Sequence, residues 1–336
     1  MMANDEVFSV IKAVEIAEPV QKRAWLIDQL WAASAVGIIG GQPKCCKSWL
    51  ALEMAVCVAS GAKCLGRYEV LETGPALVYL AEDALEAVRE RLSALARHHG
   101  IAFEQLDVRV ITVDSIRLDL QRDQDRLQNT VRLHRPKLLI LDPLVRLHRL
   151  DENSAAEVSG LLSYLRVLQR EFDIAVALGH HTRKNAPAAQ PGQGLRGSGD
   201  FHAWADSSIY LRKNQADIVL AVEHRSAPAP DPIAVRLVVT ETEFPSAHLQ
   251  IVNAQVNPPR SAKLENRILD VLDGRELTRA AMRESLAVKN ERLGPALASL
   301  EEKGMIRRFP NGWRRLLNHT GTYCEPDGAA VPSSDS

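Results

Sequence analysis

The sequence predicts an α/β fold with a mostly parallel central sheet, followed by a small second domain. Five apolar runs alternate with helix-length amphipathic segments: VGIIG, ALVYL, VRVITV, KLLILD and IAVALGH. Strands separated by helices form βαβ crossovers, which build parallel sheets. Three later runs follow one another closely: SSIYLRK, IVLAVEH and AVRLVVT. We expect these three as added antiparallel strands at one edge of the sheet.

Changes in composition along the 336 residues predict five segments. These are a partly helical lead-in (1–30), the α/β domain (31–252), a linker (253–262), the second domain (263–317) and a polar, disordered tail (318–336). The apolar anchors of the lead-in region are Trp25, Leu26, Ile27, Leu30 and Trp31. Residues 185–200, rich in Pro, Gly and Gln, are expected to form a mobile loop inside the α/β domain.

Bulk composition indicates a globular protein without a strong charge bias. Hydrophobic residues make up 46%, charged residues 25%, and the formal net charge is -1, so any contact with nucleic acid must come from local basic patches. No run is long and apolar enough for a membrane span, and the N-terminal residues lack the apolar core of a signal peptide. We therefore expect a cytoplasmic protein with no membrane partner. Its five cysteines show no zinc-binding spacing, which favours free thiols.

The strongest motif is GGQPKCCKSWLA, in which an apolar strand leads through a glycine-containing turn into a helix. Such a strand–turn–helix binds phosphate, because the amides of the turn and the helix N-terminus attract anions. In this pattern Lys47 contacts the β- and γ-phosphates and Ser48 ligates Mg²⁺. The predicted nucleotide-binding residues are Gly41, Gln42, Pro43, Lys44, Cys45, Cys46, Lys47, Ser48 and Trp49.

This motif departs from the pattern G-x-x-x-x-G-K-[ST] at one position. Cys46 stands in place of the second glycine, where a Cβ hinders the backbone shape and the close approach of the phosphates. The sequence therefore leaves two alternatives open: a phosphate site that supports hydrolysis, and one that binds nucleotide weakly or does not hydrolyse it.

Polar residues follow three other predicted strands. KLLILD ends in Asp142, placed to hold the Mg²⁺ ion of the same nucleotide. ALVYL is followed by Glu82 and Asp83, which either orient an attacking water or act as N-terminal residues of the next helix. IAVALGHH places His180 and His181 at a strand end, where a side chain can sense the γ-phosphate or serve a structural role.

Together these segments resemble the RecA-like hexameric helicases, and among them the RepA-type plasmid replicative helicase ATPases grouped as AAA_25. The matching stretches are GQPKCCKSWLA, VYLAEDALEAVRERL, LLILDPLVRLHRLDENSA, ALGHHTRK and GLRGSGDFHAWADS, which cover most of residues 25–245. The resemblance implies a RecA-like P-loop NTPase fold, ATP and Mg²⁺ as cofactors, and a homo-oligomer in the form of a hexameric ring around single-stranded DNA. The catalytic residues that it implies are Lys47, Glu82, Asp142, His180 and Arg225.

Two of the implied roles depend on neighbouring subunits or on DNA. Arg225 matches an arginine finger acting on the next subunit, although Glu223 stands where a lysine is common and Arg225 could instead pair with an acid at the sheet edge. Residues 195–198 and Asp206 resemble the segment that closes a central DNA-binding loop, and a solvated surface role is the alternative for Arg196. The predicted DNA contacts of this domain are Arg183, Lys184 and Arg196.

The second domain shows three helical patterns followed by MIRRFPNGWRRLL, which predicts a hairpin turning at Asn311–Gly312. Three helices and a hairpin form a winged helix, which binds duplex DNA or another protein. The predicted phosphate contacts of this domain are Lys289, Arg292, Arg307, Arg308, Arg314 and Arg315.

Three functional hypotheses follow from the sequence. The first is an ATP-hydrolysing, helicase-like DNA motor of a plasmid or phage-like locus. The second is a DNA-binding regulator switched by ATP, in which Cys46 impairs turnover. The third is a structural adaptor with a vestigial phosphate loop.

Overall fold

The computed structural model describes residues 10–15, 25–182, 199–214, 217–240, 246–252, 264–286, 288 and 290–316. The chain divides into two compact units, Met1–Ala254 and Gln255–Ser336. Within the described ranges, no helix has both the length and the apolar character needed to cross a membrane.

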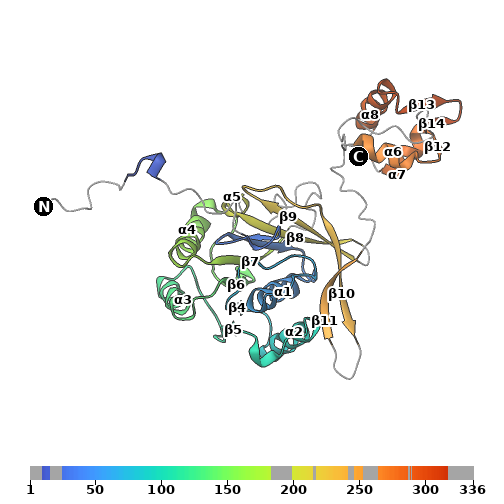
Figure 1. Ribbon diagram of the computed structural model, residues 1–336. Helices are drawn as coiled ribbons and strands as arrows, with labels where there is room; N and C mark the ends of the chain where they lie inside the picture. The colour runs from blue at the N-terminus through green and yellow to red at the C-terminus, as the bar shows by residue number, and fades with distance from the viewer. Residues whose placement is uncertain are drawn as a thin grey trace. The chain divides into compact units, whose positions relative to one another are not determined.

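Among the described residues, a nine-stranded sheet forms the centre of the first unit, in the order β11-β10-β9-β8-β3-β7-β6-β4-β5 (Figure 1). Its strands are β3 (Val36–Gly41), β4 (Ala76–Leu80), β5 (Val108–Val110), β6 (Leu138–Asp142), β7 (Ala175–His181), β8 (Ser207–Asn214), β9 (Asp217–His224), β10 (Ile233–Thr240) and β11 (Ser246–Val252). The five predicted crossover strands are parallel to one another. β8 also pairs parallel with β3, so the expectation of an antiparallel strand here was wrong, and the antiparallel edge begins at β9.

Helices cover both faces of this sheet (Figure 1). α1 (Lys47–Ser60) and α2 (Leu85–His98) pack on one face, which we call the α1 face. α3 (Gln121–His134), α4 (Ala155–Phe172) and the short α5 (Asp200–Trp204) pack on the opposite face. Short 3-10 turns are η1 (Ala13–Glu15), η2 (Phe103–Gln105) and η3 (Leu144–Arg146).

Side chains along each strand alternate between the two faces. Ile140 of β6 and Ala177 of β7 belong to the core on the α1 face, whereas Leu141 and Leu178 belong to the opposite core. This alternation decides which polar residues at the ends of the strands can reach the phosphate loop.

The end of the predicted lead-in is part of the folded unit. β1 (Trp25–Ile27) and β2 (Trp31–Ala32) form an antiparallel pair, and Leu26, Ile27, Leu30 and Trp31 are buried. These apolar anchors therefore lie in and between strands, and the helical conformation described for the lead-in is the single turn η1.

The second unit contains α6 (Leu264–Val271), β12 (Glu276–Leu277), α7 (Arg279–Leu286), α8 (Asn290–Glu302), β13 (Ile306–Phe309) and β14 (Gly312–Arg315). β12 and β13 both pair antiparallel with β14, and Ile268, Met282 and Leu297 lie in the core. Phe309 pairs with Gly312, so the turn is Pro310–Asn311, one residue earlier than expected. A Cβ at Gly312 would lie 2.4 Å from the Leu277 carbonyl oxygen, so the glycine permits close strand approach.

Candidate nucleotide-binding site

The phosphate loop lies between β3 and α1. Cys46, at the N-cap of α1, has φ 65° and ψ 28°, the left-handed conformation that glycine adopts most readily. Lys44 is also left-handed, with φ 61°. Gly41 begins the turn, and a Cβ there would lie 2.4 Å from Cys45 Sγ and 2.7 Å from the Leu211 carbonyl oxygen. The loop therefore keeps the left-handed conformation at position 46 although the residue carries a Cβ.

Lys47 and Ser48, the first residues of α1, connect the loop to the ends of β6 and β7. Lys47 is buried, and its Nζ lies 3.2 Å from the Gln42 carbonyl oxygen and 3.4 Å from His181 Nδ1. The Ser48 hydroxyl donates a 2.6 Å hydrogen bond to Asp142 Oδ2, which is 94 residues away in the sequence. A hydroxyl beside a carboxylate offers the hard oxygen ligands that Mg²⁺ prefers, so these residues fit a magnesium ion.

The electrostatics of the site also fit a cation bound to phosphate. Burial raises the pKa of Asp142, and the carboxylates of Asp83 and Glu82 act in the same direction, against the Ser48 hydrogen bond and the Lys47 charge. A divalent cation would favour the ionised carboxylate. Burial likewise raises the pKa of the Cys46 thiol. The charges acting against that rise come from Lys213, Arg91 and Lys47.

Gly179 on β7 allows Asp142 to occupy its position. A Cβ on Gly179 would lie 1.8 Å from Asp142 Oδ1 and 2.4 Å from its Cγ. Sequence reasoning missed this residue. The signal available was its position two residues before His181, which places both on the α1 face.

The two histidines of β7 point to opposite faces. His181 lies on the α1 face beside Lys47, as the 3.4 Å contact shows. His180 is buried, and its ring centroid lies 4.9 Å from that of Phe201 in α5. The implied sensing position at His180 is thus directed away from the phosphate loop, and the residue that contacts Lys47 is its neighbour.

The acids after β4 are held by arginines that were not singled out from the sequence. Glu82 is half exposed, and its Oε1 accepts a 2.9 Å hydrogen bond from Arg146 Nε. Asp83 forms an ion pair of 2.7 Å with Arg91 of α2. The guanidinium of Arg91 also lies 5.6 Å from the ring centroid of Trp49, and so connects α2 to the predicted nucleotide-binding segment.

Asp206, which precedes β8, is the centre of a second polar cluster. Its carboxylate accepts hydrogen bonds from Arg166 of α4, and Arg225 Nη1 lies 3.6 Å from Asp206 Oδ1. Arg225 also donates to the Ala203 carbonyl oxygen. Within one subunit, Arg225 therefore pairs with an acid beside the sheet, and its role as a finger in a neighbouring subunit stays a prediction.

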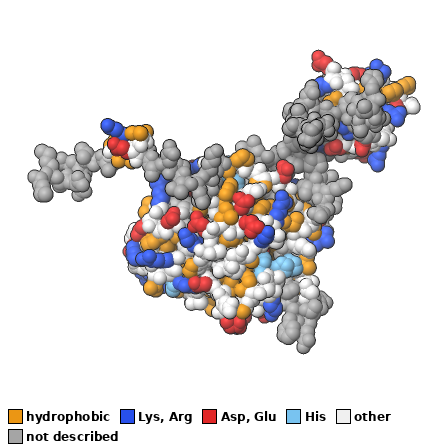
Figure 2. Space-filling view, viewed as in Figure 1, with side chains coloured by type: hydrophobic (Ala, Val, Ile, Leu, Met, Phe, Trp, Pro, Cys, Tyr) orange, Lys and Arg blue, Asp and Glu red, His pale blue; other side chains and the backbone are white. Residues whose placement is uncertain are grey.

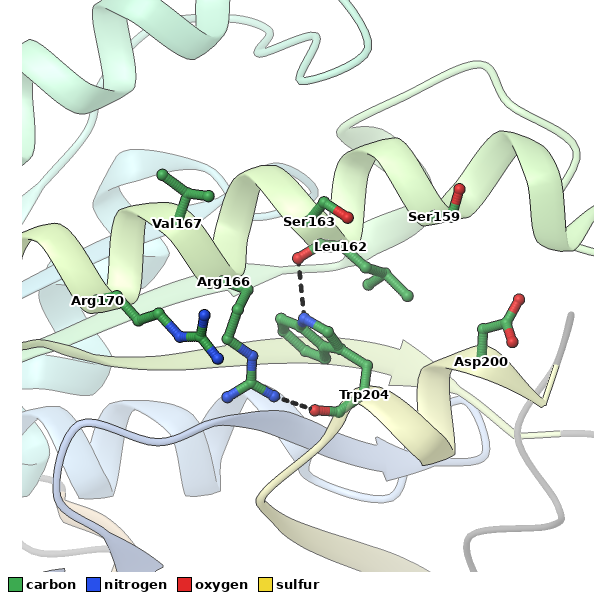
Figure 3. A pocket seen from close by; sticks show the side chains of 8 residues that line it. All are labelled: Ser159, Leu162, Ser163, Arg166, Val167, Arg170, Asp200 and Trp204. Atoms are coloured by element: carbon green, nitrogen blue, oxygen red, sulfur yellow. Dashed lines mark hydrogen bonds between the residues drawn. The ribbon is translucent and has the colours of Figure 1, made fainter. Parts of the chain in front are cut away.

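A shallow pocket of about 400 Å³ lies over α4 and α5 (Figure 3). Arg166 donates to the Trp204 carbonyl oxygen there, and Trp204 Nε1 donates to the Leu162 carbonyl oxygen at 2.9 Å. Arg170 of α4 points into the same area (Figure 3). Sequence reasoning missed this basic pair on α4, which the structure places beside the segment that follows residues 183–198.

The predicted DNA contacts lie partly outside the described residues. Arg183, Lys184, Arg196 and Lys289 lie outside the described residues, and Arg292 is described only as part of α8. In the second unit, Arg307, Arg308 and Arg314 are exposed and Arg315 is half-buried. Arg307 and Arg314 are directly opposite each other on β13 and β14. Arg314 is also opposite Glu276 of β12, whose carboxylate offsets the like charges at this position.

The phosphate loop, the Ser48–Asp142 pair and the order of the parallel strands define a RecA-like P-loop NTPase fold. The family model AAA_25, an AAA domain, matches residues 6–187, more than half of the chain. This chain therefore belongs to the AAA_25 family.

Two solved structures are similar to the chain. The first is the crystal structure of the RadB recombinase, at 18% identity and a TM-score of 0.48, covering 66% of this chain and 92% of that one. The second is the ATPase domain of G40P, at 14% identity and a TM-score of 0.46, covering 61% of this chain and 82% of that one.

Proposed function

We propose that this protein is an ATP- and Mg²⁺-dependent ATPase that acts as an oligomeric, helicase-like motor on DNA. The observation that supports it best is the 2.6 Å hydrogen bond between Ser48 and Asp142, next to the buried amine of Lys47. These groups come from the end of β6 and the N-terminus of α1, and together they match the chemistry of a Mg²⁺–triphosphate site.

Each residue of the site has a defined task in this proposal. Lys47 would bind the phosphates, and Ser48 and Asp142 would hold Mg²⁺, which when bound would neutralise charge on the phosphoryl oxygens. Glu82 orients the attacking water, and Arg146 fixes the Glu82 carboxylate through the 2.9 Å hydrogen bond. Because His181 rather than His180 contacts Lys47, we assign the sensing role to His181.

The proposed DNA contacts lie in two places. In the first unit, the loop of residues 185–200 would face the channel of a ring, and Arg166 and Arg170 of α4 line the pocket to which Asp200 also contributes. In the second unit, proposed as a winged helix, the exposed side chains of Arg307 and Arg314 would contact phosphates. Figure 2 shows basic and acidic side chains interspersed over the visible face of the first unit, consistent with local rather than global attraction to DNA.

The test is ATP turnover by the purified protein with and without single-stranded DNA, alongside Lys47→Ala and Glu82→Gln. DNA-stimulated turnover that is lost in both variants supports the motor. Glu82→Gln should retain ATP binding, because the phosphate-binding residues are unchanged, whereas Lys47→Ala should weaken it. Turnover that persists in Lys47→Ala would contradict the assigned site.

A second function, a DNA-binding regulator switched by ATP, is favoured by one observation. Cys46 holds a left-handed conformation with a Cβ at the position where the nucleotide approaches the loop. ATP binding that changes the oligomeric state without measurable turnover would support the regulator over the motor.

A further inference from the structure

Four potential metal ligands converge beyond the phosphate loop, between the later turns of α1 and the end of α2. They are Glu53 and Cys57 on α1, Cys64 in the segment after α1, and His99 at the C-cap of α2. At 1.5 Å rise per residue, Cys57 lies about 15 Å along α1 from Lys47, so this cluster is separate from the nucleotide site. Glu53, Cys57 and Cys64 are each at most 1% exposed, and the His99 side chain is 8% exposed.

The two distances from the Cys57 sulfur match those between ligands of one tetrahedral ion, whereas His99 and Glu53 lie closer together, at hydrogen-bond distance. Cys57 Sγ lies 3.5 Å from His99 Nε2 and 3.6 Å from Glu53 Oε1, and His99 Nε2 lies 3.0 Å from Glu53 Oε1. The ligand atoms of Glu53, Cys57 and Cys64 all lie within 4.8 Å of one another. Standard zinc–sulfur, zinc–nitrogen and zinc–oxygen bond lengths in a tetrahedron give ligand separations of about 3.4–3.8 Å.

We propose that Glu53, Cys57, Cys64 and His99 bind one structural Zn²⁺ ion. Both thiols would bind as thiolates and release their protons to solvent, while the carboxylate binds ionised and the imidazole binds through a neutral Nε2. Two soft sulfur ligands select zinc over the Mg²⁺ of the nucleotide site. Four protein ligands in a buried position leave no open coordination site, so the ion is structural rather than catalytic.

The surroundings already orient the ligands. The Leu65 backbone N–H donates a 2.9 Å hydrogen bond to Glu53 Oε1, which fixes the carboxylate as outer-shell partners do in metal sites. Next to His99, His98 stacks on His248 of β11 with ring centroids 3.5 Å apart. Histidine side chains reach the surface where α2 and β11 meet (Figure 2).

A zinc ion here would join two helices that carry the nucleotide site. α1 begins with Lys47, and α2 follows Glu82 and Asp83 at the end of β4. The site is not recognisable from the sequence, because the six residues between Cys57 and Cys64 do not match a standard zinc-binding spacing and His99 follows another helix.

The test is the zinc content of the full-length protein purified without chelators, measured by mass spectrometry of the metals. Cys57→Ser/Cys64→Ser is compared with the control Cys324→Ser, which replaces a cysteine that is not one of the four proposed ligands. We expect one zinc ion per chain in the wild type and the control, and its loss from the double variant. Cobalt exchanged into the wild type should give the visible absorption of a tetrahedral thiolate site, and a strong chelator should lower the melting temperature.

Three results would overturn the proposal. The first is a wild-type protein that neither retains zinc nor gives the cobalt spectrum, which would make the cluster a hydrogen-bond network only. The second is a native mass two hydrogens lower, with Cys57 and Cys64 joined as a disulfide. The third is equal zinc retention by the double variant. If that variant does not fold, the cobalt spectrum and chelator response of the wild type decide. These readouts do not require ATPase activity, so they stand apart from the proposed function.

Discussion

Replacing Gly179 by alanine should damage the nucleotide site without touching any residue of the phosphate loop. The added Cβ would overlap the Asp142 carboxylate, with 1.8 Å to Oδ1 and 2.4 Å to Cγ. Asp142 belongs to β6 and is 5% exposed, so its side chain has little free space to enter. The overlap must therefore displace the carboxylate or separate β6 from β7.

Both responses lower the free energy of unfolding by an amount that follows from the contacts involved. Overpacking of a well-packed interior costs about 1–3 kcal/mol. Loss of the Ser48–Asp142 hydrogen bond, which involves a charged acceptor, adds about 1.5–3 kcal/mol. Because these effects partly overlap, we expect the free energy of unfolding to fall by about 3 kcal/mol and the melting temperature to fall by roughly 6–12 °C. Displacing a magnesium ligand by about 1 Å should also lower turnover by ~100-fold.

The assay is thermal unfolding combined with ATP turnover over a range of Mg²⁺ concentrations. Gly160→Ala is the matched control, because Gly160 lies in α4 with nothing within 4 Å of its added Cβ. That control should gain stability of about 0.5–1 kcal/mol, as expected for alanine in a helix. Wild-type melting temperature and turnover in Gly179→Ala would refute the reasoning, since the close approach of β7 to Asp142 would then carry no consequence.

Four further substitutions test the site. Cys46→Gly removes about 1 kcal/mol of left-handed strain and should raise ATP turnover; a large gain supports the regulator, and a loss contradicts it. His181→Ala removes the contact with Lys47 and should lower turnover by about 10-fold, the effect of losing one hydrogen bond. His180→Ala should chiefly lower the free energy of unfolding, by about 2–3 kcal/mol. The reverse pattern would contradict the assignment. Arg225→Ala should lower turnover by ~1,000-fold if Arg225 is an arginine finger. Mixing this variant with Lys47→Ala subunits should partly restore activity, because each variant supplies the group that the other lacks. No recovery argues against action between subunits.

Much of the fold follows from the order of apolar runs along the chain. The five crossover strands and their helices were predictable, because each run is followed by an amphipathic segment of helix length. β11 was missed, since SAHLQIV is short and mixed in polarity, and it is recognisable only from its pairing with β10. The parallel pairing of β8 was also missed, because the short helix α5 before it returns the chain in the parallel direction.

Local spacing locates the candidate site but not the contacts within it. Lys47 and Asp142 were predictable because each follows a buried strand in a recognisable motif. Sequence reasoning could have decided between His180 and His181, because counting alternate residues back along IAVALGHH places Gly179 and His181 on one face. Arg146 and Arg91 were not predictable, because their partners, Glu82 and Asp83, come close only once β4, β6 and α2 are assembled.

The environment of Cys46 connects the question of hydrolysis to the fold. A glycine at this position adopts the left-handed conformation freely, whereas cysteine holds it only if the surrounding structure opposes the strain. That support comes from both sides: Cys45 is buried against Gly41, and α1 is anchored through Ser48 to Asp142. The loop therefore keeps the shape that binds phosphate, and what Cys46 can change is the approach of the nucleotide to the backbone. ATP affinity and turnover should accordingly be affected separately, which is the distinction between the motor and the regulator.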